Sequence, residues 1–257
     1  MLSRSKAPAL FVAVAVVVAI TAFLLPPIPL PHAYHDFADQ RTFLGVPNFG
    51  NVASNLPFAI VGLWGLIALL RPNSPIQFVD PRERWPYLIV FAGLIWTAFG
   101  SAYYHLAPDN ARLFWDRLPI MVVFMAIVAT VITERFGIHY GLLALPVLLA
   151  IGVYSVVQPR AGDLRGHSDL RFYAAVQVCS ILFLLLALLS PPRYTRGSDY
   201  AIVVAFYVLA KLAEEADRPI FALGHIVSGH TLKHLAAAAA GYWILRMLQK
   251  RSIVRAA

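Results

Sequence analysis

The sequence predicts an all-α polytopic membrane protein, and two observations carry this prediction. Of its 257 residues, 60% are hydrophobic and only 13% are charged, whereas charged residues make up about a quarter of a soluble domain. The apolar residues occur in runs of roughly 18–23, which is the length an α-helix needs to cross the hydrocarbon core of a bilayer. An outer-membrane barrel would instead need segments of about ten residues with alternating polarity, so we expect helices.

Eight apolar runs are candidates for membrane-spanning helices. In chain order they cover residues 8–25, 47–70, 86–107, 112–133, 139–157, 169–190, 199–213 and 226–248. The first follows Arg4 and Lys6, and its long apolar stretch lacks a small-residue cleavage signal before Pro26, so we interpret it as a retained helix and not a signal peptide. The middle runs are bounded by short polar linkers, and the last contains the small residues Ala236–Ala240, which favour close helix packing. We therefore expect a single membrane-embedded helical domain over residues 1–257.

The formal net charge is +8, and we expect these charges to face lipid headgroups and not nucleic acid. Basic residues of membrane proteins gather in cytoplasmic loops and at cytoplasmic helix ends. The linker 71–84 and the tail at Lys250 and Arg251 carry such residues. We therefore predict that both termini face the cytoplasm and that the protein lies in a bacterial inner membrane. The single cysteine, Cys179, excludes a thiolate cluster, so a metal ion would need histidine or carboxylate ligands.

Three polar clusters interrupt the apolar runs, where ionisable groups are costly and therefore informative. Ser101 and His105 are four residues apart near the end of the third run, and His230 and His234 have the same spacing near the start of the eighth. Residues four apart share a helix face. Asp116 lies near the start of the fourth run. Because neighbouring spans alternate in direction, all three clusters are expected at the extracytoplasmic end of the bundle.

This set of side chains predicts a catalytic zinc site. Three histidines (His105, His230 and His234) leave the fourth position of zinc open for water, which can be deprotonated near neutral pH. Asp116 is then the candidate general base, and Ser101 the candidate hydroxyl donor to a developing oxyanion. The alternative is that each His–Ser or His–His pair forms only hydrogen bonds between helices.

The pattern of Ser-x3-His, an aspartate eleven residues later and a late His-x3-His resembles the alkaline ceramidases. These are seven-span zinc amide hydrolases, in a superfamily that also includes the adiponectin- and progestin-type receptors. The resemblance covers residues 36–248, with the stretch 48–55 similar to the first core helix, and makes the span 8–25 an addition before a seven-transmembrane-helix core. It implies His105, His230 and His234 as zinc ligands, Asp116 as the proton acceptor and Ser101 as the oxyanion stabiliser.

Animal members of that family also bind calcium through an acidic segment before the first core helix. The counterpart here comprises Asp36, Asp39, Arg41 and Asn48. It departs from the family pattern, because Arg41 stands where a neutral oxygen ligand is expected and Asn48 where a carboxylate is expected. Calcium prefers oxygen ligands without a cationic neighbour, so we hypothesise that the Arg41 guanidinium replaces calcium and pairs with Asp36 or Asp39. A solvated charged loop is the alternative.

The resulting expectation is a zinc-dependent membrane amidohydrolase that cleaves the N-acyl amide bond of a ceramide-like lipid to a free fatty acid and an amino-alcohol base. A hydrolase of ester-linked phospholipids and a non-catalytic receptor or transporter that uses the histidines are the alternatives. The acidic residues Glu214, Glu215 and Asp217 precede the last run; we interpret them as structural, and a position at the rim of the site is the alternative.

Overall fold

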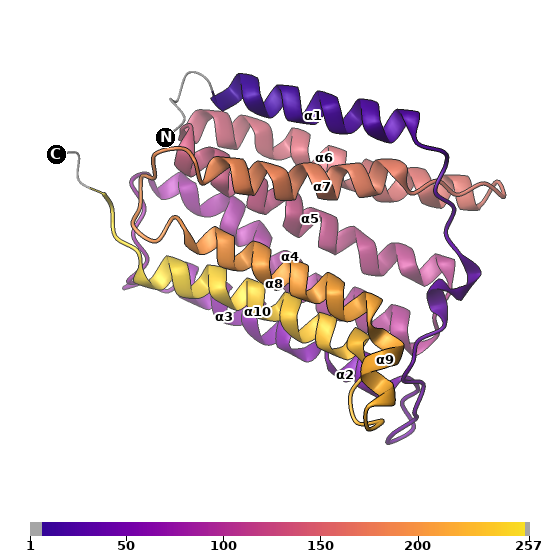
Figure 1. Cartoon of the computed structure of the whole chain (residues 1–257). Coiled ribbons are helices and arrows are strands. Elements are labelled where there is room, and N and C mark those ends of the chain that lie inside the picture. The colour runs from indigo at the N-terminus through magenta and orange to yellow at the C-terminus, as the bar shows by residue number, and fades with distance from the viewer. Residues whose placement is uncertain (1–6, 255–257) are drawn as a thin grey trace.

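The computed structural model describes residues 7–254 and contains only α- and 3-10 helices as regular elements over that range, so the all-α prediction is confirmed. Long helices lie side by side, and successive ones run in opposite directions (Figure 1). The elements are α1 Ala7–Leu24, η1 His32–His35, α2 Phe49–Ala53, α3 Leu56–Leu70, η2 Pro81–Glu83, α4 Arg84–Leu106, α5 Asn110–Arg135, α6 Ile138–Asp163, α7 Arg171–Ala187, α8 Asp199–Glu215, α9 Asp217–Ala222 and α10 Gly229–Lys250.

A helix lies at each of the eight predicted runs, with three differences in detail. The run 47–70 is divided into α2 and α3 at Ser54–Asn55, because Pro57 has no backbone N–H to continue the helical hydrogen bonds. Helix α6 continues to Asp163, six residues beyond the predicted end. The short helix α9, between α8 and α10, has no counterpart among the predicted runs.

Four helical stretches between residues 7 and 254 are long and apolar enough to cross a membrane: Phe49–Leu70, Pro81–Leu106, Asn110–Arg135 and Ile138–Asp163. Ala9–Leu24 and Arg171–Ala187 are shorter apolar helices. Helices α7 and α8 have 17 residues each, about 26 Å at 1.5 Å per residue, which is a little less than the hydrocarbon thickness of a bilayer. The chain is therefore an α-helical membrane protein.

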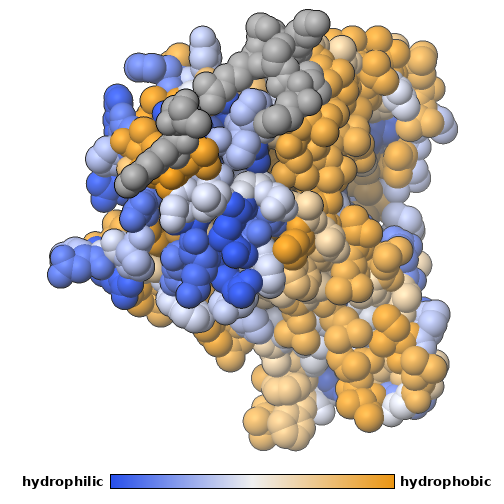
Figure 2. Space-filling model, turned by 60° about the vertical axis from the view of Figure 1, so that its left-hand side comes forward, coloured by the Kyte–Doolittle hydropathy of each residue, from blue (hydrophilic) through white to orange (hydrophobic). Residues whose placement is uncertain are grey.

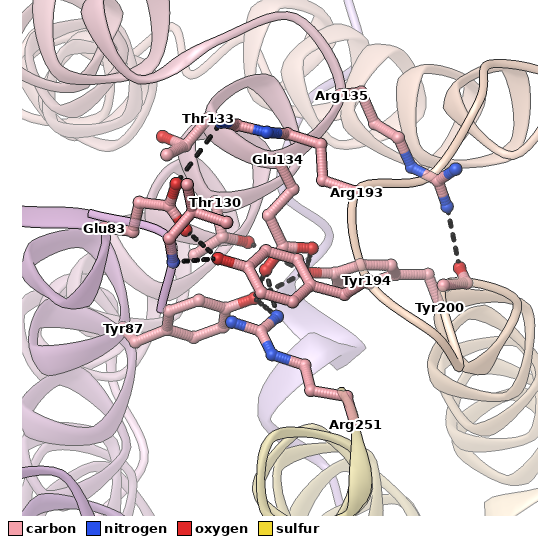
Figure 3. Close-up of polar contacts among 12 residues, drawn as sticks. Glu83, Tyr87, Thr130, Thr133, Glu134, Arg135, Arg193, Tyr194, Tyr200 and Arg251 are labelled. Atoms are coloured by element: carbon pink, nitrogen blue, oxygen red, sulfur yellow. Dashed lines mark hydrogen bonds and ion pairs between the residues drawn. The ribbon is translucent and has the colours of Figure 1, made fainter. Parts of the chain in front are cut away.

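The end of the bundle at which α1 begins and α10 ends is rich in polar residues. Figure 2 shows hydrophilic residues gathered there, with hydrophobic residues covering the adjoining sides of the molecule. The side chain of Arg251 is buried at this end and ion-pairs with Glu134 of α5, while its guanidinium lies 3.9 Å from the ring centroid of Tyr194 (Figure 3). The Tyr87 hydroxyl also donates to Glu134. This cluster fastens the segment after α10 to the bundle.

At the opposite end, glycine allows α4 and α5 to approach closely. A Cβ atom on Gly100 would lie 2.2 Å from the backbone oxygen of Trp115, so any larger residue there would force the two helices apart. The close approach brings the last turns of α4 beside the first turns of α5. Ser101 and His105 on α4 are thereby placed at the same end of the bundle as Asp116 on α5.

Candidate metal centre

Three buried histidines from two helices meet at this end of the bundle. His105 lies in the last turn of α4, and His230 and His234 lie in the first two turns of α10. One ring nitrogen of each residue lies within 4.8 Å of those of the other two. The Nε2 atoms of His105 and His230 are 3.3 Å apart. The structure thus brings together the three histidines that the sequence singled out.

The arrangement fits a tetrahedral metal ion. With Zn–N bonds of about 2.0–2.1 Å, two ligands of a tetrahedral zinc lie about 3.3 Å from each other, the separation observed between His105 and His230. Nδ1 of His105 is buried without a hydrogen-bond partner among the described residues. Within residues 7–254, the triad is also the one group of three or more His, Cys, Asp or Glu side chains whose ligand atoms converge. The triad can therefore hold a metal ion.

Two side chains from the region before α3 support the histidines. The Ser54 hydroxyl lies 2.8 Å from Nδ1 of His234, which leaves Nε2 of that ring for a metal ion. The Asn48 side-chain amide donates to the backbone oxygen of His105 at 2.9 Å. Partners of this kind fix the orientation of metal ligands. Asn48, predicted as part of a calcium-site counterpart, thus contacts the backbone of a histidine of the triad.

Phe37 covers the triad from the side of the N-terminal segment. Its ring centroid lies 4.7 Å from that of His105 and 4.5 Å from that of His230, and its side chain is itself buried. His105, His230 and His234 are 0%, 5% and 3% exposed. Phe37 therefore shields the candidate metal centre from solvent on that side, a role that no sequence motif indicated.

Ser101 and Asp116 line the same cavity as His234. The cavity has a volume of about 190 Å³ and lies among α3, α4, α5, α7, α8 and α10. Both side chains are buried. Most of the remaining lining is apolar and includes Phe58, Leu94, Val123, Ile127, Leu184 and Ile244. The cavity combines a polar end beside the histidines with a long apolar wall.

The polar end also contains charged residues that the sequence analysis did not assign to the site. Lys233 lies 2.5 Å from Glu214 and 3.5 Å from Nε2 of His230. Glu214 also binds Lys211. Arg117 lines the cavity between the rings of Tyr34 and Tyr173. Lys233 follows His230 by three positions and therefore shares its helix face, a signal that was present in the sequence.

The acidic segment before α2 is held by arginines. The Arg41 guanidinium donates two hydrogen bonds of 2.8 Å to Asp39 and also binds the backbone oxygens of His225 and Ile226. Asp36 pairs instead with Arg218 at 2.5 Å. The hydrogen bonds from Arg41 lower the pKa of the buried Asp39 carboxyl below its ordinary value of 3.8. Arg41 thus ties the segment around residues 36–41 to the linker that precedes α10.

Asp217 strengthens the same connection. One of its carboxylate oxygens accepts from the backbone N–H of His230 at 2.7 Å, and the other accepts from the N–H of Ala38 at 2.8 Å. The structural interpretation of Asp217 agrees with these contacts, whereas Glu214, interpreted in the same way, lines the cavity.

No family model matches this sequence, and no curated protein sequence matches it.

Proposed function

We propose that this protein is a zinc-dependent membrane amidohydrolase that cleaves the N-acyl amide bond of a lipid and releases a free fatty acid. The observation that carries the proposal is that Ser101, Asp116 and His234 line one largely apolar cavity, and that ring nitrogens of His105 and His230 converge with that of His234. An acyl chain is the kind of ligand that such a wall accommodates, because burying each CH₂ group contributes about 0.8 kcal/mol. Its amide group would then lie beside the histidines.

We also propose a seven-span core and membership of the alkaline ceramidase family. The residues Ser101, His105, Asp116, His230 and His234 match the pattern of the alkaline ceramidases, with α2–α10 as the seven-span core and α1 as an addition. Under this proposal the hydrolase lies in a bacterial inner membrane with both termini in the cytoplasm and the histidines near the extracytoplasmic face. Arg84 at the start of α4, Arg135 at the end of α5 and Arg251 after α10 lie at the hydrophilic end at which α1 begins (Figure 2), and basic residues at that end support this orientation.

The side chains divide the reaction between them. A zinc ion held by His105, His230 and His234 would polarise the amide carbonyl and lower the pKa of a water molecule. Asp116 accepts the proton of the attacking water and later returns it to the departing nitrogen. The Ser101 hydroxyl donates a hydrogen bond to the carbonyl oxygen as negative charge develops there. Phe37 excludes bulk water from the histidines.

The first test is the zinc content of detergent-purified protein. We expect about one zinc per chain in the wild type and none in His230→Ala. Asp116→Asn serves as the matched variant, because it changes the catalytic base and leaves all three histidines, so its zinc content should be unchanged. A folded wild type without zinc after incubation with the ion would overturn the proposal.

The second test is release of fatty acid from an N-acyl lipid and from an O-acyl lipid with the same chain. Zinc-dependent release from the amide, lost in both His230→Ala and Asp116→Asn, supports the proposal. Release from the ester alone would favour a phospholipid esterase. Bound zinc with no release from either lipid would favour a receptor or transporter in which the histidines bind a metal ion or relay protons.

A further inference from the structure

Arg117 is a buried cation that lines the cavity beside the candidate metal centre. Its side chain lies on α5 and is 7% exposed. Its guanidinium carbon is 5.0 Å from the ring centroid of Tyr34 and 4.9 Å from that of Tyr173. Nε has no hydrogen-bond partner among residues 7–254, and no carboxylate in that range forms an ion pair with the side chain.

A buried guanidinium without a carboxylate is unusual, because removing a charge from water costs several kcal/mol unless an opposite charge compensates for it. Two aromatic rings supply part of the compensation through cation–π contacts. They leave the Nε–H donor without a partner among residues 7–254, so an anion in the cavity can accept from it. Arg117 therefore has the features of a residue kept for a negatively charged ligand.

The other charges around the cavity do not compensate for Arg117. Glu214 is shared between Lys211 and Lys233, so these three side chains together carry one positive charge. Asp116 is the remaining carboxyl group among the residues that line the cavity. With both carboxyl groups ionised, the lining holds three cations and two anions, and a bound metal ion would add further positive charge. The polar end of the cavity thus attracts anions.

We propose that the cavity selects N-acyl lipids whose headgroup carries a carboxylate or a phosphate, and that Arg117 binds this anionic group. The planar guanidinium suits both groups, because it can donate two parallel hydrogen bonds to either. This inference rests on the proposed amidase function and narrows its substrate class from neutral ceramide-like lipids to anionic N-acyl amphiphiles. For an N-acyl amino acid, water adds to the carbonyl carbon, the C–N bond breaks, and a fatty acid and a free amino acid leave.

Binding by the full chain in phosphatidylcholine nanodiscs tests the inference without requiring turnover. Three probes share a palmitoyl amide: N-palmitoylglycine, N-palmitoyl-O-phosphoethanolamine and the neutral N-palmitoylethanolamine. The protein is first stripped of metal with a chelator, so that direct binding of the anion to a metal ion does not contribute. We expect at least one anionic probe to bind about tenfold more tightly than the neutral one, and a comparison of the two identifies the preferred headgroup.

Substitutions of Arg117 locate the source of this preference. Arg117→Gln should remove it while retaining binding of the neutral amide, and Arg117→Lys should preserve part of it. The matched control is Arg246→Gln, since Arg246 also stacks on an aromatic ring, at 4.7 Å from the centroid of Trp243, but does not line the cavity. Should Arg117→Gln fail to fold, the comparison between probes in the wild type and in Arg117→Lys still decides the question.

The outcomes separate this inference from the proposed function. Equal affinity of the wild type for all three probes, or an undiminished preference in Arg117→Gln, would overturn the role of Arg117. Zinc-dependent hydrolysis of the neutral and anionic amides at the same rate would contradict the inference and leave the amidase proposal standing. Selective binding of anionic amides without hydrolysis would support the inference as a binding property and count against the amidase.

Discussion

The Ser54 hydroxyl lies 2.8 Å from Nδ1 of His234, a residue 180 positions later in the chain. This contact joins the break between α2 and α3 to the first turns of α10. It fixes the orientation of one histidine in the triad, and Ser54 is itself buried. The division of the predicted run 47–70 into two helices therefore places a hydrogen-bonding group beside the candidate metal centre.

We expect Ser54→Ala to weaken zinc binding by about 10- to 100-fold, the effect typical of removing a partner that orients a metal ligand. The measurement is the zinc dissociation constant from competition with a chelator. Ser155→Ala is the matched control, because Ser155 is also buried but donates to the backbone oxygen of Gly152 within α6. Equal zinc affinities in Ser54→Ala and Ser155→Ala would show that the contact does not support the metal centre.

For Ser101, we expect replacement by alanine to lower kcat by about 10²-fold with little change in KM. Its hydrogen bond would strengthen only as charge develops on the carbonyl oxygen, so its loss affects the transition state more than the bound substrate. Steady-state kinetics with an N-acyl substrate provide the measurement, and Ser101→Thr retains the hydroxyl as a control. An unchanged kcat in Ser101→Ala would exclude this role.

The ion pair between Asp39 and Arg41 should make the stability of the fold depend on pH. Arg41 lowers the pKa of the Asp39 carboxyl in the folded protein below its ordinary value of 3.8. The pair therefore stabilises the fold at pH values above 3.8, and its contribution is lost as the pH falls through the lowered pKa. The difference in melting temperature between wild type and Asp39→Asn should be largest near neutrality and should shrink in acid. In an Arg41→Ala background, Asp39→Asn should have little effect.

The same ion pair argues against calcium in this segment. Because Arg41 already occupies both carboxylate oxygens of Asp39, we expect calcium to leave the melting temperature of the wild type unchanged. A rise with calcium in the wild type that is absent in Asp36→Ala would contradict the hypothesis that Arg41 replaces the ion. Magnesium at the same concentration controls for general effects of a divalent cation.

At the other end of the bundle, we expect Arg251→Ala to destabilise the protein by about 3–5 kcal/mol, because it leaves the Glu134 carboxylate buried without its partner. The side chains of the pair are 1% and 6% exposed. The double substitution Arg251→Met with Glu134→Gln should recover much of the loss. Thermal unfolding in detergent provides the measurement, and Arg82→Ala, which breaks an exposed pair with Asp80, should have little effect. Equal melting temperatures for Arg251→Ala and wild type would refute a structural role for the pair.

Hydropathy predicted the helices well, because runs of apolar residues of bilayer length leave the backbone few alternatives to a helix. It predicted membrane crossing less directly. Helix α10 is long enough to cross a membrane, but it contains His230, Lys233 and His234. These residues of the polar centre lower the mean hydropathy of the helix. The break between α2 and α3 depends on Pro57 alone. A hydropathy average over the run 47–70 does not reveal the effect of a single proline.

The histidine triad was predictable because its spacing is local within each helix and antiparallel neighbours bring the two helix ends together. Phe37, Ser54 and Arg117 were not, since their contacts depend on how the segment between α1 and α3 folds over the ends of α4, α5 and α10. A lone phenylalanine or serine in that segment carries no periodic signal. Lys233 was predictable from its spacing, because it follows His230 by three residues and shares its helix face.

The cover that Phe37 forms over the histidines has a kinetic consequence. On the side that Phe37 covers, a bound ion would exchange with the medium when the segment around residues 36–41 lifts away, and that segment is fastened by Arg41 and Asp217. Local opening of this kind has its own free energy. The rate at which a chelator strips the ion would then reach a plateau at high chelator concentration, and that plateau would report how often the segment opens.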